Sequence, residues 1–173
     1  YAIIENTKAE ENEVINFAEK LGPVRTTNWG KLFNVISKPN PNDLAYTALE
    51  LKSHSDNPYR KPVPGIQLLH CIANESTGGD SSLVDGFSVA EYLKLNHRDF
   101  YEILTKTSVI FKFTDVDVIL ENKSKLIELD SDGNFKQISF SGRLDYVPLL
   151  NDKHLDIFYK ARKCMYELCN SDQ

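Results

Sequence analysis

Residues 54–71 read HSDNPYRKPVPGIQLLHC, and they carry the strongest indications of architecture and chemistry in this sequence. A histidine and an aspartate two positions apart come first, and a proline-rich segment typical of turns follows them. The apolar run 66–73 then closes the stretch and extends just past it. A nearly continuous apolar run of this length is typical of a β-strand covered on both faces. The sequence therefore predicts a buried sheet that the chain enters through a rigid turn.

The pair His54 and Asp56 is a candidate for metal binding. In an extended segment, residues two apart project to the same face, so an imidazole and a carboxylate can bind one cation together. Two such groups and a remote histidine form the facial triad of non-haem Fe(II) oxygenases. The pair alone is a weak indication, because chance supplies roughly 0.3 of them in a chain of this composition. The alternative is a surface histidine beside a turn-forming aspartate.

The rest of the chain alternates between segments with helical patterns and segments with strand patterns. Capping-box patterns at Thr7 and Ser88 predict helices that run to Leu21 and Leu104, and an amphipathic pattern predicts a third helix from Asp152. Predicted strands cover residues 32–36, 44–51, 66–73 and 109–113, and a hairpin covers 125–129 and 135–140 around an Asp-Gly turn. Strands with helices at their ends and edges favour an α+β fold with a sandwich or jelly-roll core.

Composition excludes several classes of protein. The chain has 173 residues, with 20 Lys and Arg against 25 Asp and Glu, which suits one domain and argues against nucleic-acid binding. We find no apolar run near the ~20 residues that span a membrane, and no leader-like opening. The 3 cysteines are an odd number without metal-ligand spacing, so we expect free thiols and a cytoplasmic setting.

Four segments together carry a family resemblance. They are LAYT at 44–47, HSDNPY at 54–59, PGIQLLHC at 64–71 and GGDSSLVDGF at 78–87. In order and spacing they closely resemble the γ-butyrobetaine hydroxylase branch of the taurine dioxygenase-like family. The resemblance implies an Fe(II)- and 2-oxoglutarate-dependent oxygenase with a double-stranded β-helix core of the jelly-roll, clavaminate synthase-like type, flanked by helices.

The resemblance also implies roles for individual residues. His54 and Asp56 match the first two iron ligands, and Ser81 matches a hydroxyl that helps to hold the distal carboxylate of 2-oxoglutarate. The alternative for Ser81 is an ordinary turn serine. The implied partners are a small-molecule substrate and O₂, and the implied reaction is hydroxylation of an unactivated C–H bond.

The substrate side of the resemblance rests on aromatic residues. Trp29, Phe33 and Tyr46 fall where relatives hold a trimethylammonium group in an aromatic cage. Packing in a core is the alternative, and it suits Phe33 best. Asn57 replaces an aromatic residue of the carnitine-making relatives, and Asp43 replaces an amide. These two departures leave open γ-butyrobetaine itself, a trimethyllysine-like compound, a sulfonate and a phosphonate.

One part of the family pattern has no counterpart. We find neither the distal histidine that would be the third ligand nor the arginine that follows it, so residues 1–173 are predicted to be a single, partial oxygenase catalytic domain without its C-terminal segment. We expect this chain alone to bind Fe(II) weakly and not to turn over 2-oxoglutarate. Unpaired strand edges would favour a homo-oligomer. The alternative is a non-catalytic β-helix module for binding or assembly.

Overall fold

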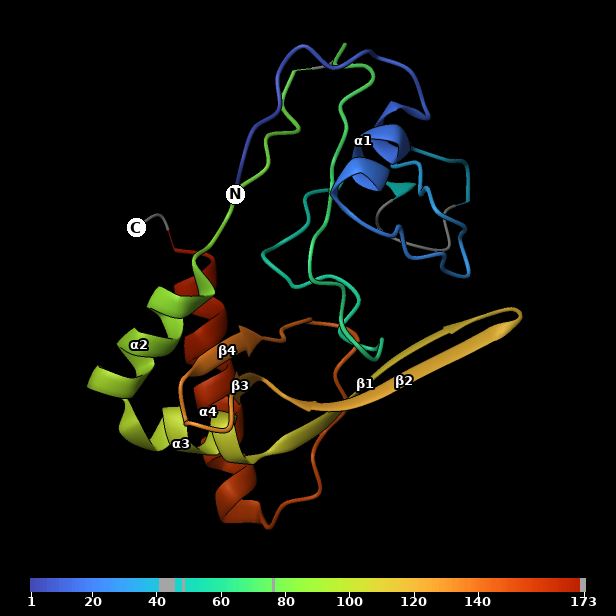
Figure 1. Cartoon of the computed structure of the whole chain (residues 1–173). Coiled ribbons are helices and arrows are strands. Elements are labelled where there is room, and N and C mark those ends of the chain that lie inside the picture. Colours follow the sequence, from blue (N-terminus) through green and yellow to red (C-terminus); the bar gives the residue numbers. More distant parts are fainter. Residues whose placement is uncertain (41–45, 48, 76, 172–173) are drawn as a thin grey trace. The chain divides into compact units, whose positions relative to one another are not determined.

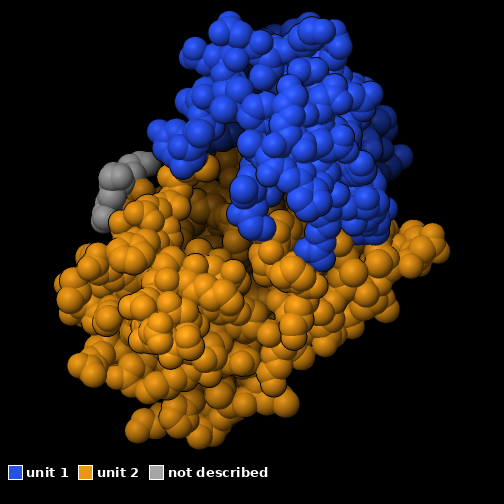
Figure 2. All heavy atoms as spheres, viewed as in Figure 1, with its two compact units in different colours: residues 1–49, 65–81 blue, residues 50–64, 82–173 orange. Residues whose placement is uncertain are grey.

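The computed structural model describes residues 1–40, 46–47, 49–75 and 77–171. The chain divides into two compact units (Figure 2). Unit 1 comprises Tyr1–Leu49 and Gly65–Ser81, and unit 2 comprises Glu50–Pro64 and Ser82–Gln173.

Unit 1 contains one helix, α1 (Glu13–Leu21), among its described residues. The predicted end of this helix is confirmed, and the Gly22 amide donates to the Ala18 carbonyl at 3.0 Å. The predicted start is wrong. The N-cap is Asn12 instead of Thr7, and its side chain makes no capping hydrogen bond.

The strands predicted in unit 1 are not present. Residues 32–36 and 66–73 are described and form no strand, and the described part of 44–51 forms none either. Ile66 and Leu69 are 77% and 73% exposed, so the prediction of a strand buried on both faces is wrong for this chain. A strand needs a neighbour to pair its backbone groups, and the described residues offer 66–73 no such neighbour.

Unit 2 contains three helices among its described residues: α2 (Gly86–Asn96), α3 (Arg98–Lys106) and α4 (Asp152–Cys169). Both α2 and α3 pack against α4, as Figure 1 shows. Leu93 of α2, Leu104 of α3 and Phe158 of α4 are almost fully buried. All the buried hydrophobic side chains of the described residues belong to unit 2. The hydrophobic core therefore lies there.

The predicted helix over 88–104 is two helices instead of one. The first begins at Gly86, because Asp85 and not Ser88 is its N-cap: the Asp85 carboxylate accepts from the Phe87 amide at 2.9 Å and from the Ser88 hydroxyl at 2.8 Å. A Cβ at Gly86 would lie 2.9 Å from Cγ2 of Ile138, so glycine permits a close approach to the strand that ends at Ile138.

The strands of unit 2 form two antiparallel pairs. Strand β1 (Ser108–Asp115) pairs with β2 (Val118–Lys125), and β3 (Ile127–Leu129) pairs with β4 (Phe135–Ile138). The predicted strand at 109–113 is confirmed as part of β1, and the predicted Asp-Gly hairpin is confirmed as β3 and β4. Gly133 in its turn has φ +83°, a value that favours glycine. The sequence did not predict β2.

A third segment completes the pairing of β1. The Lys112 amide donates to the Leu144 carbonyl at 2.9 Å, and the Tyr146 amide donates to the Ile110 carbonyl at 2.8 Å. Between these two residues, Asp145 accepts hydrogen bonds of 2.7 and 3.0 Å from the guanidinium of Arg162 on α4. This bidentate ion pair fixes the segment that pairs with β1 to α4.

The regular structure of the described residues consists of helices and small antiparallel sheets, in agreement with the α+β part of the fold prediction. The jelly-roll arrangement stays a prediction. Within the described ranges, no helix has the length and apolarity required to cross a membrane.

Candidate metal centre

The His54–Asp56 pair lies in unit 2 on a segment that belongs to no helix or strand. Ser53 and Ser55 are half-buried, whereas His54 and Asp56 are exposed, which is the two-residue alternation of an extended chain. The expected juxtaposition is present, since His54 Nε2 lies 3.3 Å from Asp56 Oδ1. The two side chains are 40% and 43% exposed, so the pair is open to a ligand from solvent.

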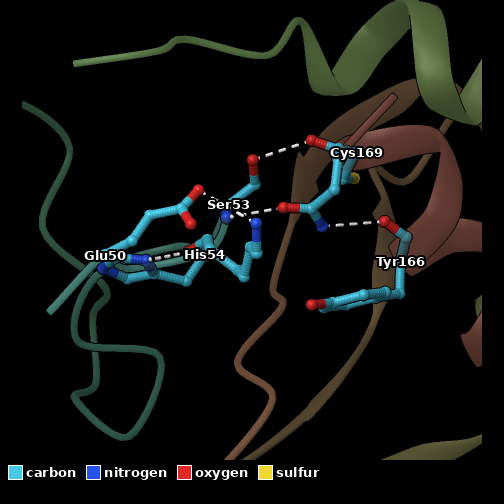
Figure 3. Close-up of polar contacts among 7 residues, drawn as sticks. Glu50, Ser53, His54, Tyr166 and Cys169 are labelled. Atoms are coloured by element: carbon cyan, nitrogen blue, oxygen red, sulfur yellow. Dashed lines mark hydrogen bonds and ion pairs between the residues drawn. The ribbon is translucent and has the colours of Figure 1, made fainter. Parts of the chain in front are cut away.

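A backbone carbonyl fixes the imidazole of His54. The ring atom Nδ1 lies 2.7 Å from the carbonyl oxygen of Lys52 (Figure 3). Because a carbonyl oxygen only accepts, Nδ1 is the donor and carries a hydrogen. The lone pair of Nε2 then points toward an acceptor, the Asp56 carboxylate, and a cation between them is needed to make this contact favourable.

A proton on Nε2 is one cation that makes this contact favourable. The hydrogen bond to Asp56 raises the pKa of His54 above its ordinary value; burial opposes this rise, and the contact with Lys52 adds to it. The positive charge of Arg143 acts in the opposite direction and lowers the pKa of His54. A metal ion at this place would have to displace the proton.

The donor set fits a divalent transition metal. Two bonds of about 2.1 Å that meet at a right angle put their donor atoms about 3.0 Å apart, close to the separation found here. An imidazole whose other nitrogen donates to a backbone carbonyl is the usual form of a metal-binding histidine. Among the residues that the structure describes, no third His, Cys, Asp or Glu joins the pair to form a group of three.

The three predicted cage residues come together in unit 1. The ring centroids of Trp29 and Phe33 are 5.3 Å apart, and those of Phe33 and Tyr46 are 5.2 Å apart. All three side chains are half-buried, and Phe33 lies between the other two. The ammonium of Lys38 lies 3.7 Å from the centroid of the Tyr46 ring. A cation therefore already contacts one ring face of this cluster.

The other predicted site residues have different outcomes. Asp43 lies outside the described residues. Ser81 is exposed in unit 1, so its place beside the His54–Asp56 pair stays a prediction. Asn57 has φ +53°, a left-handed conformation that asparagine tolerates well, and its side-chain oxygen accepts from the Tyr59 hydroxyl and Arg60 Nε. This gives Asn57 a structural role beside the predicted contact with substrate.

Sequence reasoning missed several residues around the pair. The serines on either side of His54 bond to distant parts of unit 2, and Arg143 is near enough to influence the charge of His54. The alternation Ser-His-Ser-Asp was a signal for the serines, because it places both on the face opposite the pair. No pattern in the sequence pointed to the Lys52 carbonyl or to Arg143.

Comparison with known proteins identifies the class to which this fold and site belong. The family described as "Taurine catabolism dioxygenase TauD, TfdA family" matches residues 1–173. The chain belongs to this family.

Individual relatives are similar over most of the chain. Gamma-butyrobetaine dioxygenase of Homo sapiens is 36% identical over 167 residues, covering 93% of this chain and 43% of the relative. The protein of the same name from Pseudomonas sp. (strain AK-1) is 36% identical over 152 residues, covering 88% and 40%. Trimethyllysine dioxygenase of Meyerozyma guilliermondii is 31% identical over 173 residues, covering 97% and 43%. The chain thus spans less than half the length of these relatives.

Proposed function

We propose that this chain forms part of an Fe(II)- and 2-oxoglutarate-dependent dioxygenase that hydroxylates a small quaternary-ammonium compound such as γ-butyrobetaine. The observation that carries the proposal is the geometry of His54 and Asp56: two metal donors 3.3 Å apart, with the imidazole oriented by the Lys52 carbonyl. Membership of a dioxygenase family supports the same conclusion.

His54 Nε2 and one Asp56 carboxylate oxygen would hold the iron, and a third ligand would come from outside the described residues. When bound, iron and 2-oxoglutarate supply the oxidising power for hydroxylation by O₂. Asp56 neutralises part of the metal charge, while the Lys52 carbonyl keeps the imidazole in the tautomer that can bind metal. The Ser81 hydroxyl would donate a hydrogen bond to the distal carboxylate of 2-oxoglutarate.

The cationic end of the substrate would lie against the aromatic cluster. Trp29, Phe33 and Tyr46 offer ring faces, and the Lys38 contact with Tyr46 supports the view that these faces accept a cation. Asp43 and Asn57 would supplement this region with a carboxylate and an amide. The names of the human and bacterial relatives make γ-butyrobetaine the first substrate to test.

Trimethyllysine is the second candidate substrate. It is favoured by the similarity to the yeast trimethyllysine dioxygenase, which extends over 97% of this chain. Both candidates carry a trimethylammonium group, so the aromatic cluster serves either one. The similarity to dioxygenases over most of the chain does not favour the non-catalytic module, and the named relatives do not favour a sulfonate or a phosphonate. We further propose that residues 1–173 belong to one catalytic domain with a jelly-roll core.

The test measures substrate-coupled succinate formation by the complete natural translation product. His54→Ala and Asp56→Ala should each abolish it, because removal of one ligand leaves a weak and open metal site. His154→Ala and Asp156→Ala are matched controls: both residues are exposed on α4 and should leave turnover unchanged. Wild-type turnover by either of the first two variants at saturating iron would contradict the proposal.

A further inference from the structure

The residue before His54 is tied to the C-terminal end of α4. The Ser53 hydroxyl donates to the carbonyl of Cys169 at 2.7 Å, and the Ser53 amide donates to Oδ1 of Asn170 at 3.0 Å (Figure 3). The Asn170 side chain is itself fixed, because its Nδ2 donates to the carbonyl of Tyr166 at 2.8 Å. Ser53 is therefore attached to a carbonyl and a side chain that are held in place by the last turn of an 18-residue helix.

The residue after His54 is tied to a different element. The Ser55 amide donates to the Phe140 carbonyl at 2.7 Å, and the Phe140 amide donates to the Ser55 hydroxyl, also at 2.7 Å. The same hydroxyl donates to the Phe140 carbonyl at 3.1 Å. Phe140 is only 3% exposed and follows β4, so this second attachment leads into the core of unit 2.

These two attachments fix the backbone on both sides of His54. In an extended segment, Ser53 and Ser55 face one side, so His54 and Asp56 must face the other. The contact between Nδ1 of His54 and the Lys52 carbonyl then fixes the orientation of the imidazole ring. Metal ligands held in this way before the ion arrives bind it more tightly, since less order has to be created on binding.

We propose that Ser53 and Ser55, together with Asn170 at the end of α4, are positioning residues that hold the His54–Asp56 pair in its metal-binding geometry. This inference rests on the proposed function. This role differs from a general contribution to stability. It predicts that a variant loses metal affinity even where its thermal unfolding is unchanged. It also makes the C-terminal end of α4 part of the metal centre, although no α4 side chain is assigned as a ligand.

Ser53→Ala is the primary variant. It removes the hydroxyl that reaches Cys169 and leaves the backbone contacts intact. Ser171→Ala is its matched control, because the Ser171 hydroxyl also donates to an α4 carbonyl, that of Leu168 at 3.0 Å, which is not an acceptor of either Ser53 hydrogen bond. Ser53→Thr keeps a hydroxyl and serves as the rescue. Ser55→Ala is less suitable, since it would leave the buried Phe140 amide without its acceptor.

The experiment titrates the 173-residue chain with Mn(II), a redox-stable substitute for Fe(II), and follows the paramagnetic broadening of the His54 ring signals by NMR. We expect Ser53→Ala to weaken Mn(II) binding about tenfold, the usual effect of removing a residue that orients a ligand. Ser53→Thr and Ser171→Ala should stay within about twofold of the wild type. Thermal unfolding of each variant shows whether the fold has changed.

A second measurement needs no metal. Asn170→Ala removes the acceptor of the Ser53 amide, so we expect faster hydrogen exchange at Ser53 and weaker Mn(II) binding in the same protein. Unchanged Mn(II) affinity in both Ser53→Ala and Asn170→Ala would overturn the inference and leave the proposed function standing. An equal loss in Ser171→Ala would also overturn it, by showing general loosening of α4. A wild-type chain without a His54-dependent response to Mn(II) would overturn the inference, whereas the proposed function is decided separately by succinate formation in the complete natural translation product.

Discussion

Unit 2 contains a core of buried apolar side chains, whereas none of the buried hydrophobic side chains of the described residues lies in unit 1. Phe111, Ile127 and Phe158 of unit 2 are buried almost completely, but Ile66 and Leu69 of unit 1 are 77% and 73% exposed. Burial of apolar area is the main favourable contribution to folding. The comparison therefore indicates that the stability of this chain resides in unit 2, and that unit 1 contributes little of its own.

The candidate metal ligands and the aromatic cluster lie in different units. In unit 2 the His54–Asp56 pair lies on a segment that is bonded to the end of α4 and to the buried residue Phe140. In unit 1 the aromatic cluster consists of half-buried residues. We expect the His54–Asp56 pair to be well ordered in this chain alone. The aromatic cluster should depend more on its surroundings.

The largest effect on the free energy of unfolding is expected when a buried isoleucine of unit 2 is truncated, in comparison with an exposed isoleucine of unit 1. Ile127→Ala in unit 2 should lower the free energy of unfolding by about 2–5 kcal/mol, because Ile127 is fully buried in the described core. Ile66→Ala in unit 1 should change it by less than about 0.5 kcal/mol. Urea unfolding followed by circular dichroism measures both. Equal losses would show that unit 1 has a core of comparable strength.

A smaller effect is expected in the aromatic cluster. Trp29→Leu should raise the KM for a trimethylammonium substrate about thirtyfold relative to a neutral isostere, since a desolvated cation–π contact is worth about 2 kcal/mol. The assay uses the complete natural translation product. Tyr92→Leu, on an exposed part of α2, is the control and should change neither KM. The same loss for the charged and the neutral compound would show that Trp29 only packs.

The smallest effect concerns the cysteines. Burial raises the pKa of the Cys169 thiol and of the Cys164 thiol, so each forms less of the reactive thiolate at a given pH. Cys71 of unit 1 is exposed. At pH 7.5 we expect iodoacetamide to modify Cys71 first and Cys169 last, and we expect the rate at Cys169 to keep rising with pH above its ordinary pKa. Mass spectrometry of timed samples measures the order.

Early modification of Cys169 would contradict the picture of a fixed α4 end. It would mean that the last turn opens readily, and the attachment of Ser53 to the Cys169 carbonyl would then be too weak to position His54. This simple labelling experiment therefore also tests the contact on which the further inference depends.

Sequence patterns predicted the elements that depend on local chemistry. The Asp-Gly turn at 132–133 gave the hairpin of β3 and β4, and the amphipathic pattern from Asp152 gave α4. The cap at Asp85 was missed because Ser88 and Glu91 also satisfy the capping-box pattern.

The segment 66–73 shows where local patterns fail. Its composition favours a strand, but a strand exists only where another backbone pairs with it, and no described residue does so. For the same reason the jelly roll could not be derived from composition and rests on the family resemblance.

For the candidate metal centre, too, the sequence predicts one part and the tertiary structure decides the other. The sequence by itself placed His54 and Asp56 on one face, because the spacing of two residues has that consequence in any extended chain. Only the tertiary structure decided what holds them there. Ser53 contacts residues 116 and 117 positions away, and Ser55 contacts a residue 85 positions away. Contacts between such distant residues depend on how α4 and the strands pack around the common core of unit 2, and no local pattern of residues encodes that packing.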